Sequence, residues 1–494
     1  MNLSHLFPKL FITFLADRRA MDRIPHEISS HPELLEGVEG RWRLVPLTDP
    51  KSPEISHVEH DKIQAEVAGQ FDATFTRILK GDTEAEPGGF RTVPRTIIVD
   101  IMRSPAYLEK IRSMADAQGL TKDRFRILVT IPSLTCAWQS FLDDVVDYQR
   151  EADAHPGDQA RLDAFLANAT DLDIIRHRPD LPPMRNFEIN PHMGSRGANL
   201  EQDFKRRQIL MGPVLRADGI ITNGTPEIEP ESTRTTPEMM GIPLYAVGYS
   251  STESAGSEID TVPKSVNSLT VPTDTLKVKH FLDDCLTKYG KRSLAYVSFG
   301  SFCWPTGAPE MADYLITTIL AAEPPIPLVI GLASPDAKLS DQTMKLIESS
   351  GRAITSSWVP QKFLLNHDVT GFFVTHVGSG SMYECITAQV PMVMIPYYAD
   401  QPVAAGLMIQ LGIGRLLYQF CTGHEGRTFA NGVKVVGTEE AMKQEMNEMW
   451  RKMRGADGED IRRKMAEVRK QVRHSWEDGG ARKNILALGK AVTE

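Results

Sequence analysis

The chain has 494 residues, too many for one ordinary domain, and at roughly 150 residues a domain it has room for two to four. Hydrophobic residues make up 41% and charged residues 24%, a composition that excludes a disordered or fibrous protein. The formal net charge of -9 argues against a general nucleic-acid or anionic-membrane binder. Any site for a polyanion must therefore be local.

The compartment can be judged from the cysteines and the apolar stretches. The longest apolar stretches fall short of the ~18 residues that a membrane-spanning helix needs. The apolar run at 10–16 is followed at once by charged residues, without the small-residue cleavage site of a signal peptide. We therefore expect a cytoplasmic protein with no membrane span. Neither a disulfide framework nor a zinc cluster is expected, because five cysteines are scattered with no C-x-x-C pair: Cys136, Cys285, Cys303, Cys385 and Cys421.

The first half of the chain alternates short apolar, β-branched runs with longer stretches of helical period. This alternation is typical of a parallel sheet with crossover helices. A helix is predicted where Leu108, Ile111 and Ala115 recur at helical spacing, with Gly119 as its stop. Strands are predicted at 10–15, 43–47, 96–99, 125–131, 219–222 and 244–247. An α/β domain over residues 1–249 is the expected result.

A linker and a second domain follow. Residues 250–275 are rich in Ser, Thr, Pro and Gly and show almost no core-forming pattern, which indicates a linker. The alternation then restarts with a helix at 278–288 and a strand at 294–299. Further on, Met311, Leu315 and Ile319 share one helical face, and strands are predicted near Leu328 and Phe372. Residues 276–470 are therefore predicted to form a second α/β domain.

The last hundred residues are predicted to be helical and amphipathic. Ile461, Met465, Val468 and Val472 form one apolar stripe. Basic residues around this stripe are interleaved with acidic ones, which favours a solvated helix face over a nucleic-acid site. Residues 471–494 are expected to form a last helix that packs back on the amino-terminal domain.

The most informative segment is a strand, a loop and a helix between residues 371 and 388. An apolar strand at 371–375 ends at His376, a loop at 377–380 follows, and Ser381 is predicted to begin a helix. Backbone N–H groups at a helix start have no intrahelical partner and suit a phosphate group. Small residues let a ligand approach the backbone, and donors are supplied by Gly378, Ser379, Gly380, Ser381 and the ring of His376.

Two common phosphate-binding motifs do not fit this segment. No Lys follows the loop, so it is not a P-loop. Gly378 and Gly380 match the first two positions of a dinucleotide fingerprint, but the third position is Tyr383. Asp400, twenty residues after Gly380, lies beyond the end of the next strand. A nicotinamide cofactor is therefore disfavoured.

The 44 positions from 358 to 401 resemble the signature box of the family 1 UDP-glycosyltransferases of the plant-secondary-product type. The resemblance extends to ADGIITNGTPEIEP at 217–230, YAVGY at 245–249 and LAYVSFGS at 294–301. It implies the GT-B fold, an α/β architecture of two Rossmann-like domains facing each other across a cleft. Matching positions in the box are Trp358, Pro360, Gln361, His367, Gly371, Phe373, Thr375, His376, Gly378, Ser381, Glu384, Pro391, Pro396, Asp400 and Gln401.

The resemblance also implies roles for single residues. Trp358 would stack on uracil, and Gln361 with its neighbour Val359 would contact the nucleoside. Glu384 would accept hydrogen bonds from the ribose hydroxyls. The diphosphate would lie against His376, Ser301 and the loop 378–381. Asp400 and Gln401 would bind sugar hydroxyls, and Gln at the last position is associated with glucose donors, so UDP-glucose is the preferred donor.

This sequence departs from the family pattern in two places. Residues 379–381 are Ser-Gly-Ser where plant members have Trp-Asn-Ser, which weakens the assignment of the donor sugar. Family members also present a histidine base after their first strand, oriented by an aspartate that Asp100 matches. Here the first strand and its histidine would lie before residue 1, which would leave two strands of the sheet without a partner. His5, His26 and His31 lie in the wrong elements for this role.

Structural explanations remain open for three of these residues. Asp100 could be a helix N-cap, Glu384 a favourable charge in a first helical turn, and His376 a core histidine. The resemblance favours an inverting UDP-sugar transferase acting on a small hydroxylated acceptor, with no metal or other cofactor and as a monomer. The alternative is a protein that binds a UDP-sugar without turnover. Nothing in the sequence identifies the class of acceptor.

Overall fold

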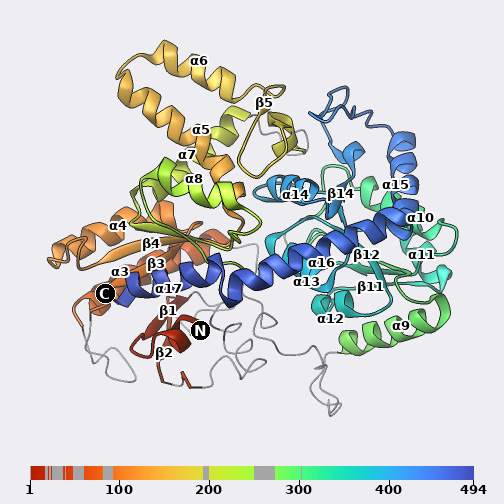
Figure 1. The fold of residues 1–494 in the computed structure, drawn as a ribbon, viewed down its shortest axis with the longest axis horizontal. Helices are drawn as coiled ribbons and strands as arrows, with labels where there is room; N and C mark the ends of the chain where they lie inside the picture. The colour runs from red at the N-terminus through yellow and green to blue at the C-terminus, as the bar shows by residue number, and fades with distance from the viewer. Residues whose placement is uncertain are drawn as a thin grey trace. The chain divides into compact units, whose positions relative to one another are not determined.

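The computed structural model describes residues 2–16, 21, 24, 37–38, 40–47, 60–81, 93–192, 200–249, 273–301 and 303–493. The chain forms two compact units (Figure 1). The first comprises Met1–Thr130, Pro213–Ile221 and Arg482–Glu494, and the second Ile131–Gly212 and Thr222–Ala481. These units divide the chain differently from the boundaries suggested at 249, 275 and 470, which stay a prediction. The suggested linker lies outside the described residues up to position 272.

The first unit contains short parallel strands. β1 pairs with β2 in parallel, with Ile12 opposite Trp42, and β3 pairs with β4 in parallel, with Thr96 opposite Arg126. β3, β4 and β7 follow one another in a second sheet. The elements of this unit are α1 (Asn2–Leu6), β1 (Ile12–Ala16), β2 (Trp42–Pro46), α3 (His60–Leu79), β3 (Thr96–Asp100), α4 (Ser104–Ala117), β4 (Arg126–Ile131), the 3-10 turn η4 (Val214–Arg216), β7 (Gly219–Thr222) and α17 (Gly480–Thr493).

Among the described residues, β1, β2 and β3 each have a single ladder partner. Within the described residues β1 pairs only with β2, and β3 pairs only with β4. The expectation that a strand before residue 1 would leave two neighbours without a ladder partner stays a prediction.

The second unit is built on a six-stranded sheet in the order β11-β10-β9-β12-β13-β14, in which every pair is parallel. Its elements before the sheet are α5 (Thr135–Ala154), α6 (Gln159–Ala169), β5 (Ile175–Arg176), β6 (Met184–Arg185), η2 (Asn186–Ile189), α7 (Leu200–Met211), α8 (Pro230–Met240), β8 (Leu244–Ala246) and α9 (Thr273–Tyr289). Those of the sheet region are β9 (Leu294–Ser298), α10 (Glu310–Leu320), β10 (Leu328–Gly331), α11 (Asp341–Ser350), β11 (Ala353–Ser356), α12 (Gln361–Asn366), β12 (Thr370–Thr375), α13 (Ser379–Ala388), β13 (Met392–Met394), α14 (Gln401–Gln410), β14 (Gly414–Leu416), η6 (Tyr418–Phe420), α15 (Glu439–Arg454) and α16 (Ala456–Glu477).

The core of this unit explains why its strands are continuous apolar runs. β9, β10, β12 and β13 are buried along their whole length, because helices cover a parallel sheet on its faces. Helices α12 and α15 contact β12, and α14 contacts β14. Phe372 of β12 stacks on Trp450 of α15 with ring centroids 5.4 Å apart. Burial of these apolar side chains supplies most of the stability of the sheet.

The strands and helices that the sequence predicted are present in the structure. Each of the six strands predicted in the first half exists, with ends that differ by at most two residues. The helix expected at 278–288 is longer, because α9 begins at Thr273 and ends at Tyr289. The apolar faces are also confirmed: Met311, Leu315 and Ile319 are buried in α10, as are Ile461, Met465 and Val468 in α16.

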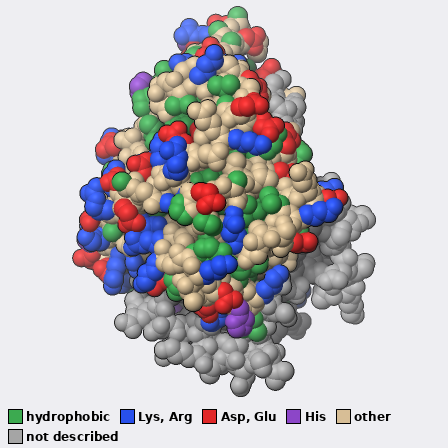
Figure 2. Space-filling model, turned by 90° about the vertical axis from the view of Figure 1, so that its right-hand side faces the viewer, with side chains coloured by type: hydrophobic (Ala, Val, Ile, Leu, Met, Phe, Trp, Pro, Cys, Tyr) green, Lys and Arg blue, Asp and Glu red, His purple; other side chains and the backbone are tan. Residues whose placement is uncertain are grey.

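Charged side chains of α16 pair within the helix, as expected for a solvated face. Arg463 and Lys464 both pair with Asp460, and Lys470 pairs with Glu467 at 2.9 Å. On the face of the molecule shown in Figure 2, basic and acidic side chains are interspersed rather than segregated. Such exposed pairs contribute little stability each, about 0.3–0.5 kcal/mol in a helix.

Glu229 is a completely buried carboxylate that joins two helix starts of the second unit. Its oxygens accept hydrogen bonds from the backbone N–H groups of Cys136, in the first turn of α5, at 2.8 Å and of Thr225 at 3.1 Å. Burial raises its pKa to about 7. Because the unfolded value is lower, the contribution of this group to stability declines as the pH rises from 4.5 through 7.

Replacing Glu229 by Ala is expected to lower the free energy of unfolding by about 3 kcal/mol, because two buried N–H donors lose their acceptor. Chemical denaturation at pH 6 measures this loss. Glu231→Ala, which removes an exposed acid from the same helix, is the matched control and should change stability by less than about 0.5 kcal/mol. Equal effects of the two substitutions would contradict the capping role.

Candidate functional site

Loops at the carboxyl ends of β9, β12 and β13 form the candidate site. The strand order reverses between β9 and β12, which are neighbours in the sheet although β10 and β11 come between them in the chain. In open parallel sheets, ligands bind beyond the carboxyl ends of the strands at such a reversal. The segment that the sequence singled out for phosphate binding follows β12, so the topology places it there.

The turn after β12 leads directly into α13. The helix begins at Ser379, two residues earlier than predicted, and Gly378 is its N-cap residue with no side-chain cap. The predicted loop is therefore shorter, because Ser379 and Gly380 already belong to the first turn. Val377 has a positive φ of 64° although it is β-branched and fully buried. Such strain costs about 1–3 kcal/mol and is concentrated at functional sites.

His376 is held between two glycines. A Cβ atom on Gly378 would lie 2.6 Å from Nε2 of the ring, and one on Gly300 would lie 2.8 Å from its Cε1. Only glycine at both positions leaves room for the imidazole. Gly300, which follows β9, was not identified from the sequence as a site residue, although its neighbour Ser301 was. Ser301 lies exposed in the same turn.

The ring of His376 is neutral and has a free nitrogen. Burial lowers its pKa to about 4, and the backbone of Ser298 raises the pKa by a smaller amount. Nδ1 is buried and makes no well-formed hydrogen bond among the described residues, and the same is true of Oγ of Ser379. Two unsatisfied polar atoms beside an uncapped helix start are costly in a folded protein unless a ligand completes them. An anion with several acceptor oxygens would do so.

We expect Gly378→Ala to weaken binding of UDP about tenfold, because the added Cβ would force the imidazole of His376 out of its position. The backbone of Gly378 has φ -61°, so the substitution introduces no backbone strain and the effect reports on the ring. Calorimetric titration with UDP measures it. Gly69→Ala is the matched control, because a Cβ there meets no atom within 4 Å. Unchanged affinity in Gly378→Ala would show that the ring does not contact the ligand.

Gln361, Ser381 and Glu384 form one hydrogen-bonded network. The Nε2 atom of Gln361 donates to Glu384 Oε2 at 2.7 Å and to Ser381 Oγ at 3.1 Å. Its Oε1 accepts from the hydroxyl of Tyr296 at 3.2 Å. Tyr296 was not identified from the sequence, because a tyrosine within an apolar strand indicates a core residue. The network fixes the carboxylate of Glu384 one turn into α13, where the helix dipole also stabilises its charge.

Trp358 and Val359 lie between β11 and α12. The side chain of Trp358 is 65% exposed, an unusual state for the largest apolar residue. Its backbone is fixed, because Ser356 Oγ accepts the N–H of Trp358 at 3.2 Å and donates to its carbonyl at 2.6 Å. Val359 is half-buried and packs on the core of the second unit. An exposed indole on a fixed backbone can stack on a planar base.

Asp400 and Gln401 follow β13, and their side chains differ in the hydrogen bonds that they already make. Ser133 donates a hydrogen bond to Asp400 Oδ2, and burial raises the pKa of this carboxyl group. The oxygen of Gln401 accepts from the backbone of Tyr397 at 2.9 Å, while its Nε2 donates to Cys303 Sγ at 3.4 Å. To bind a sugar hydroxyl, Gln401 must therefore give up its weak hydrogen bond to the sulfur of Cys303. Ser133, 267 positions from Asp400, was not predicted.

Asp100 belongs to the first unit and ends β3. Its carboxylate is exposed and accepts a hydrogen bond from the N–H of Met102 at 2.9 Å. The suggestion that it is a helix N-cap is wrong, because α4 begins at Ser104 with Arg103 as N-cap. Among the described residues no histidine forms a hydrogen bond or an ion pair with Asp100. His5 lies exposed in α1, and His26 and His31 lie outside the described residues.

Tyr383 occupies the third glycine position of the dinucleotide fingerprint. This side chain is buried, and its hydroxyl bonds to Thr225 Oγ1 and to the carbonyl of Asn223, both at 2.9 Å. A residue of this size cannot replace the glycine that brings helix and strand together in that motif.

No helix in the described part of the chain is both long and apolar enough to cross a membrane.

Comparison with known proteins gives matches to UDP-glycosyltransferases. Residues 279–450 match the model of the family described as UDP-glucoronosyl and UDP-glucosyl transferase. The UDP-glycosyltransferase eriJ of Hericium erinaceus is 29% identical over 214 residues, which cover 42% of this chain and 42% of that protein. UDP-glycosyltransferase 76C1 of Arabidopsis thaliana is 26% identical over 330 residues, covering 65% and 63%. The chain thus spans less than two thirds of the length of these curated relatives.

Solved structures share the fold over the whole chain. A UGT transferase from Siraitia grosvenorii in complex with UDP aligns with a TM-score of 0.64 at 17% identity, covering 100% of this chain and 95% of that one. Medicago truncatula UGT71G1 complexed with UDP-glucose aligns with a TM-score of 0.65 at 15% identity, covering 100% and 94%. These alignments confirm the GT-B fold. The matched region, residues 279–450, is the part of the chain that is similar to the UDP-glucoronosyl and UDP-glucosyl transferase family.

Proposed function

We propose that the chain transfers glucose from UDP-glucose to a hydroxyl group of a small acceptor, with inversion at the anomeric carbon and as a monomer. The observation that carries the proposal is the pair of unsatisfied buried atoms, Nδ1 of His376 and Oγ of Ser379, beside the uncapped start of α13. A diphosphate would supply the acceptor oxygens that these groups lack. The relatives and structures named above, with UDP-glycosyltransferase in their names or UDP in their titles, support this ligand.

The other candidate residues would each bind a different part of the UDP-sugar. Trp358 offers an exposed indole for uracil, and Glu384 an oriented carboxylate for the ribose hydroxyls. Asp400 offers a carboxylate, already positioned by Ser133, for the hydroxyls of the sugar. In the transfer step the acceptor oxygen forms a bond to the anomeric carbon, while the bond to the phosphate oxygen breaks. Negative charge develops on UDP, where the start of α13 and a ring N–H of His376 stabilise it.

The acceptor proton must leave as the new bond forms, so a base must accept it. Asp100 can orient and stabilise a charged imidazole, as the family resemblance implies. The absence of a histidine bonded to Asp100 among the described residues favours a second candidate, a UDP-sugar-binding protein without turnover. No step proposed here uses a metal or other cofactor.

Two measurements on the same protein distinguish these candidates. Calorimetry with UDP-glucose tests donor binding, and mass spectrometry of a mixture of hydroxylated aromatic acceptors with UDP-glucose tests transfer. Binding with glucosylated products supports the transferase, and binding without products supports the second candidate. Failure to bind UDP-glucose at millimolar concentration would overturn both.

Trp358→Ala is expected to raise the Kd for UDP about tenfold, because stacking of a base on an aromatic ring contributes about 1–3 kcal/mol. The affinity for uridine should fall by a similar factor, because uridine keeps the base but lacks the phosphates. Leu346→Ala, which shortens another exposed apolar side chain of the same unit, is the control and should leave both affinities unchanged. If the loss affected UDP but not uridine, Trp358 would not be the uracil contact.

A further inference from the structure

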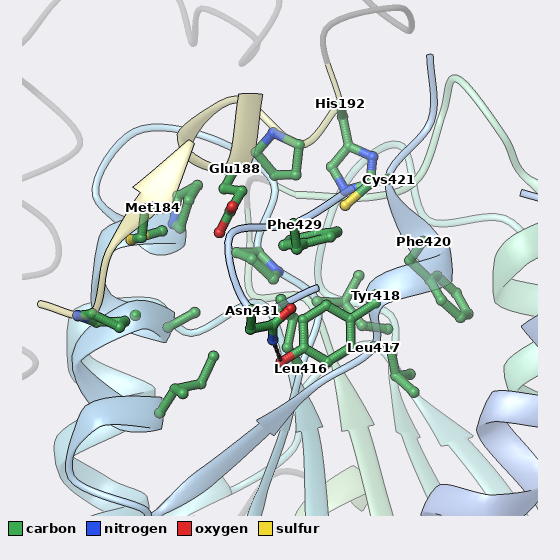
Figure 3. A pocket seen from close by; sticks show the side chains of 18 of the residues that line it. Met184, Glu188, His192, Leu416, Leu417, Tyr418, Phe420, Cys421, Phe429 and Asn431 are labelled. Carbon is green, nitrogen blue, oxygen red and sulfur yellow. Dashed lines mark hydrogen bonds between the residues drawn. The ribbon is translucent and has the colours of Figure 1, made fainter. Parts of the chain in front are cut away.

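An apolar hollow of about 650 Å³, including the space at its open mouth, lies in the second unit beside α14 and β14 (Figure 3). Aliphatic and aromatic side chains form most of its wall, among them Met184, Ile409, Leu416 and Phe429. Of the described residues that line it, none is among those assigned to the UDP-sugar.

Two segments far apart in the sequence enclose this apolar hollow, residues 182–192 and residues 416–431. Phe187 packs edge-on against Phe429 with ring centroids 5.1 Å apart. Such a closed wall is formed before any ligand arrives, so binding requires little ordering of the chain. Three polar contacts join the segments and their flanks: Arg427 to Asp173 at 2.6 Å, His424 Nε2 to the carbonyl of Asn190 at 2.8 Å, and His192 Nδ1 to Thr422 Oγ1 at 3.0 Å.

Glu188 brings a carboxylate to this apolar wall. Its Oε1 accepts hydrogen bonds from the N–H groups of Arg185 at 3.0 Å and Ala430 at 2.6 Å. Both bonds go to the same oxygen, so Oε2 has no hydrogen-bond partner among the described residues. Figure 3 shows the carboxylate between Met184 and Phe429. Burial raises the pKa of Glu188, consistent with an oxygen that is poorly solvated.

Tyr418 supplies a second polar group. Its hydroxyl oxygen accepts a hydrogen bond from Asn431 Nδ2 at 2.8 Å, as the dashed line in Figure 3 marks, which leaves the hydroxyl proton available. The hollow thus combines an apolar wall with one free acceptor and one available donor. This is the composition of a small-molecule site, in which apolar area supplies affinity and a few polar groups fix orientation.

We propose that the apolar hollow binds a small, mainly hydrocarbon molecule whose single hydroxyl or N–H group donates a hydrogen bond to Oε2 of Glu188. The site is additional to the one for the UDP-sugar and does not depend on the function proposed above. Glu188 favours ligands that carry a hydrogen-bond donor. A ligand without one would bury Oε2 with no hydrogen bond, and this weakens binding.

The proposal is tested with two probes of nearly equal size, 2-naphthol and 2-methoxynaphthalene, which differ in the hydrogen-bond donor. Calorimetry on the full chain, with saturating UDP and without a UDP-sugar, keeps the donor site filled and prevents consumption of the probe. We expect one molecule of 2-naphthol to bind per chain, and 2-methoxynaphthalene to bind about tenfold more weakly. Equal affinities would overturn the role of Glu188.

Two variants locate the probe. Ile409→Trp fills part of the hollow and should abolish binding of 2-naphthol, while UDP affinity, unchanged, shows that the protein is folded. Glu188→Gln keeps an oxygen for the two backbone N–H groups but presents an NH2 group instead of Oε2, so the preference for 2-naphthol should fall to about onefold. Glu348→Gln, an exposed acid on α11, is the control and should keep the tenfold preference. Two outcomes would overturn the proposed location. One is unchanged binding of 2-naphthol to Ile409→Trp, and the other is loss of 2-naphthol binding to the wild-type protein when UDP is added.

Discussion

Replacing His376 by Ala is expected to weaken binding of UDP-glucose by about 10- to 100-fold, because a hydrogen bond to a charged phosphate oxygen contributes about 1.5–3 kcal/mol. Among the described residues Nδ1 makes no well-formed hydrogen bond, so it is available to donate to a phosphate oxygen. Calorimetry at pH 7 measures the change. His280→Ala, which removes an exposed histidine of α9, is the matched control and should bind normally. An affinity within twofold of the wild type would refute the phosphate contact of His376.

The pH dependence of the same affinity gives an independent test. The free ring titrates near pH 4, and a bound diphosphate raises its pKa by favouring the imidazolium. The complex then takes up a proton that the free protein does not hold, so affinity rises as the pH falls from 7 toward 5. UDP-glucose suits this measurement because its diphosphate does not titrate in that range. His376→Ala should remove the slope, and a slope that persists in the variant would assign it to another group.

Asp400→Ala is expected to lower kcat/KM for UDP-glucose by about 100-fold and to leave the affinity for UDP unchanged, since the carboxylate is assigned to the sugar and UDP has none. One strong hydrogen bond to a charged group accounts for most of this loss. If the chain binds without turnover, the same substitution should remove the difference in affinity between UDP-glucose and UDP. Ser133→Ala tests whether the hydrogen bond from Ser133 positions the carboxylate of Asp400. This substitution keeps the carboxylate but removes the hydrogen bond to it, and it should lower kcat/KM by about fivefold. An equal loss of UDP affinity in Asp400→Ala would place this residue at the nucleotide instead.

The positions of the strands could be read from the sequence because a parallel sheet covered by helices buries its strands on both faces. Such strands are short continuous apolar runs, as in β9 and β12, and they are easily separated from helices of period 3.6. The ends of helices were harder to place. α13 begins at Ser379 rather than Ser381, because a small polar residue satisfies the first turn of a helix as readily as a loop.

The donor-site residues were recognised for a similar reason: most of them lie on one continuous segment. Residues 358–401 bring an exposed tryptophan, a glycine-rich turn and a carboxylate into a fixed order along the chain. Their order alone sufficed to recognise the resemblance, and residues 279–450 match the model of the family described as UDP-glucoronosyl and UDP-glucosyl transferase. The domain boundaries and the roles of single residues stay predictions.

By itself, then, the amino-acid sequence determined the alternation of strands and helices, the glycine-rich turn between a strand and a helix, and the resemblance to a known family, all of which depend on neighbours along the chain. Only the tertiary structure decided which partners these residues meet. Gly300 closes on His376 from another strand, Ser133 reaches Asp400 across 267 positions, and Glu188 faces an apolar hollow completed by a segment more than two hundred residues away. Contacts of this kind arise from close packing of side chains in three dimensions, and periodicity along a chain carries no record of them.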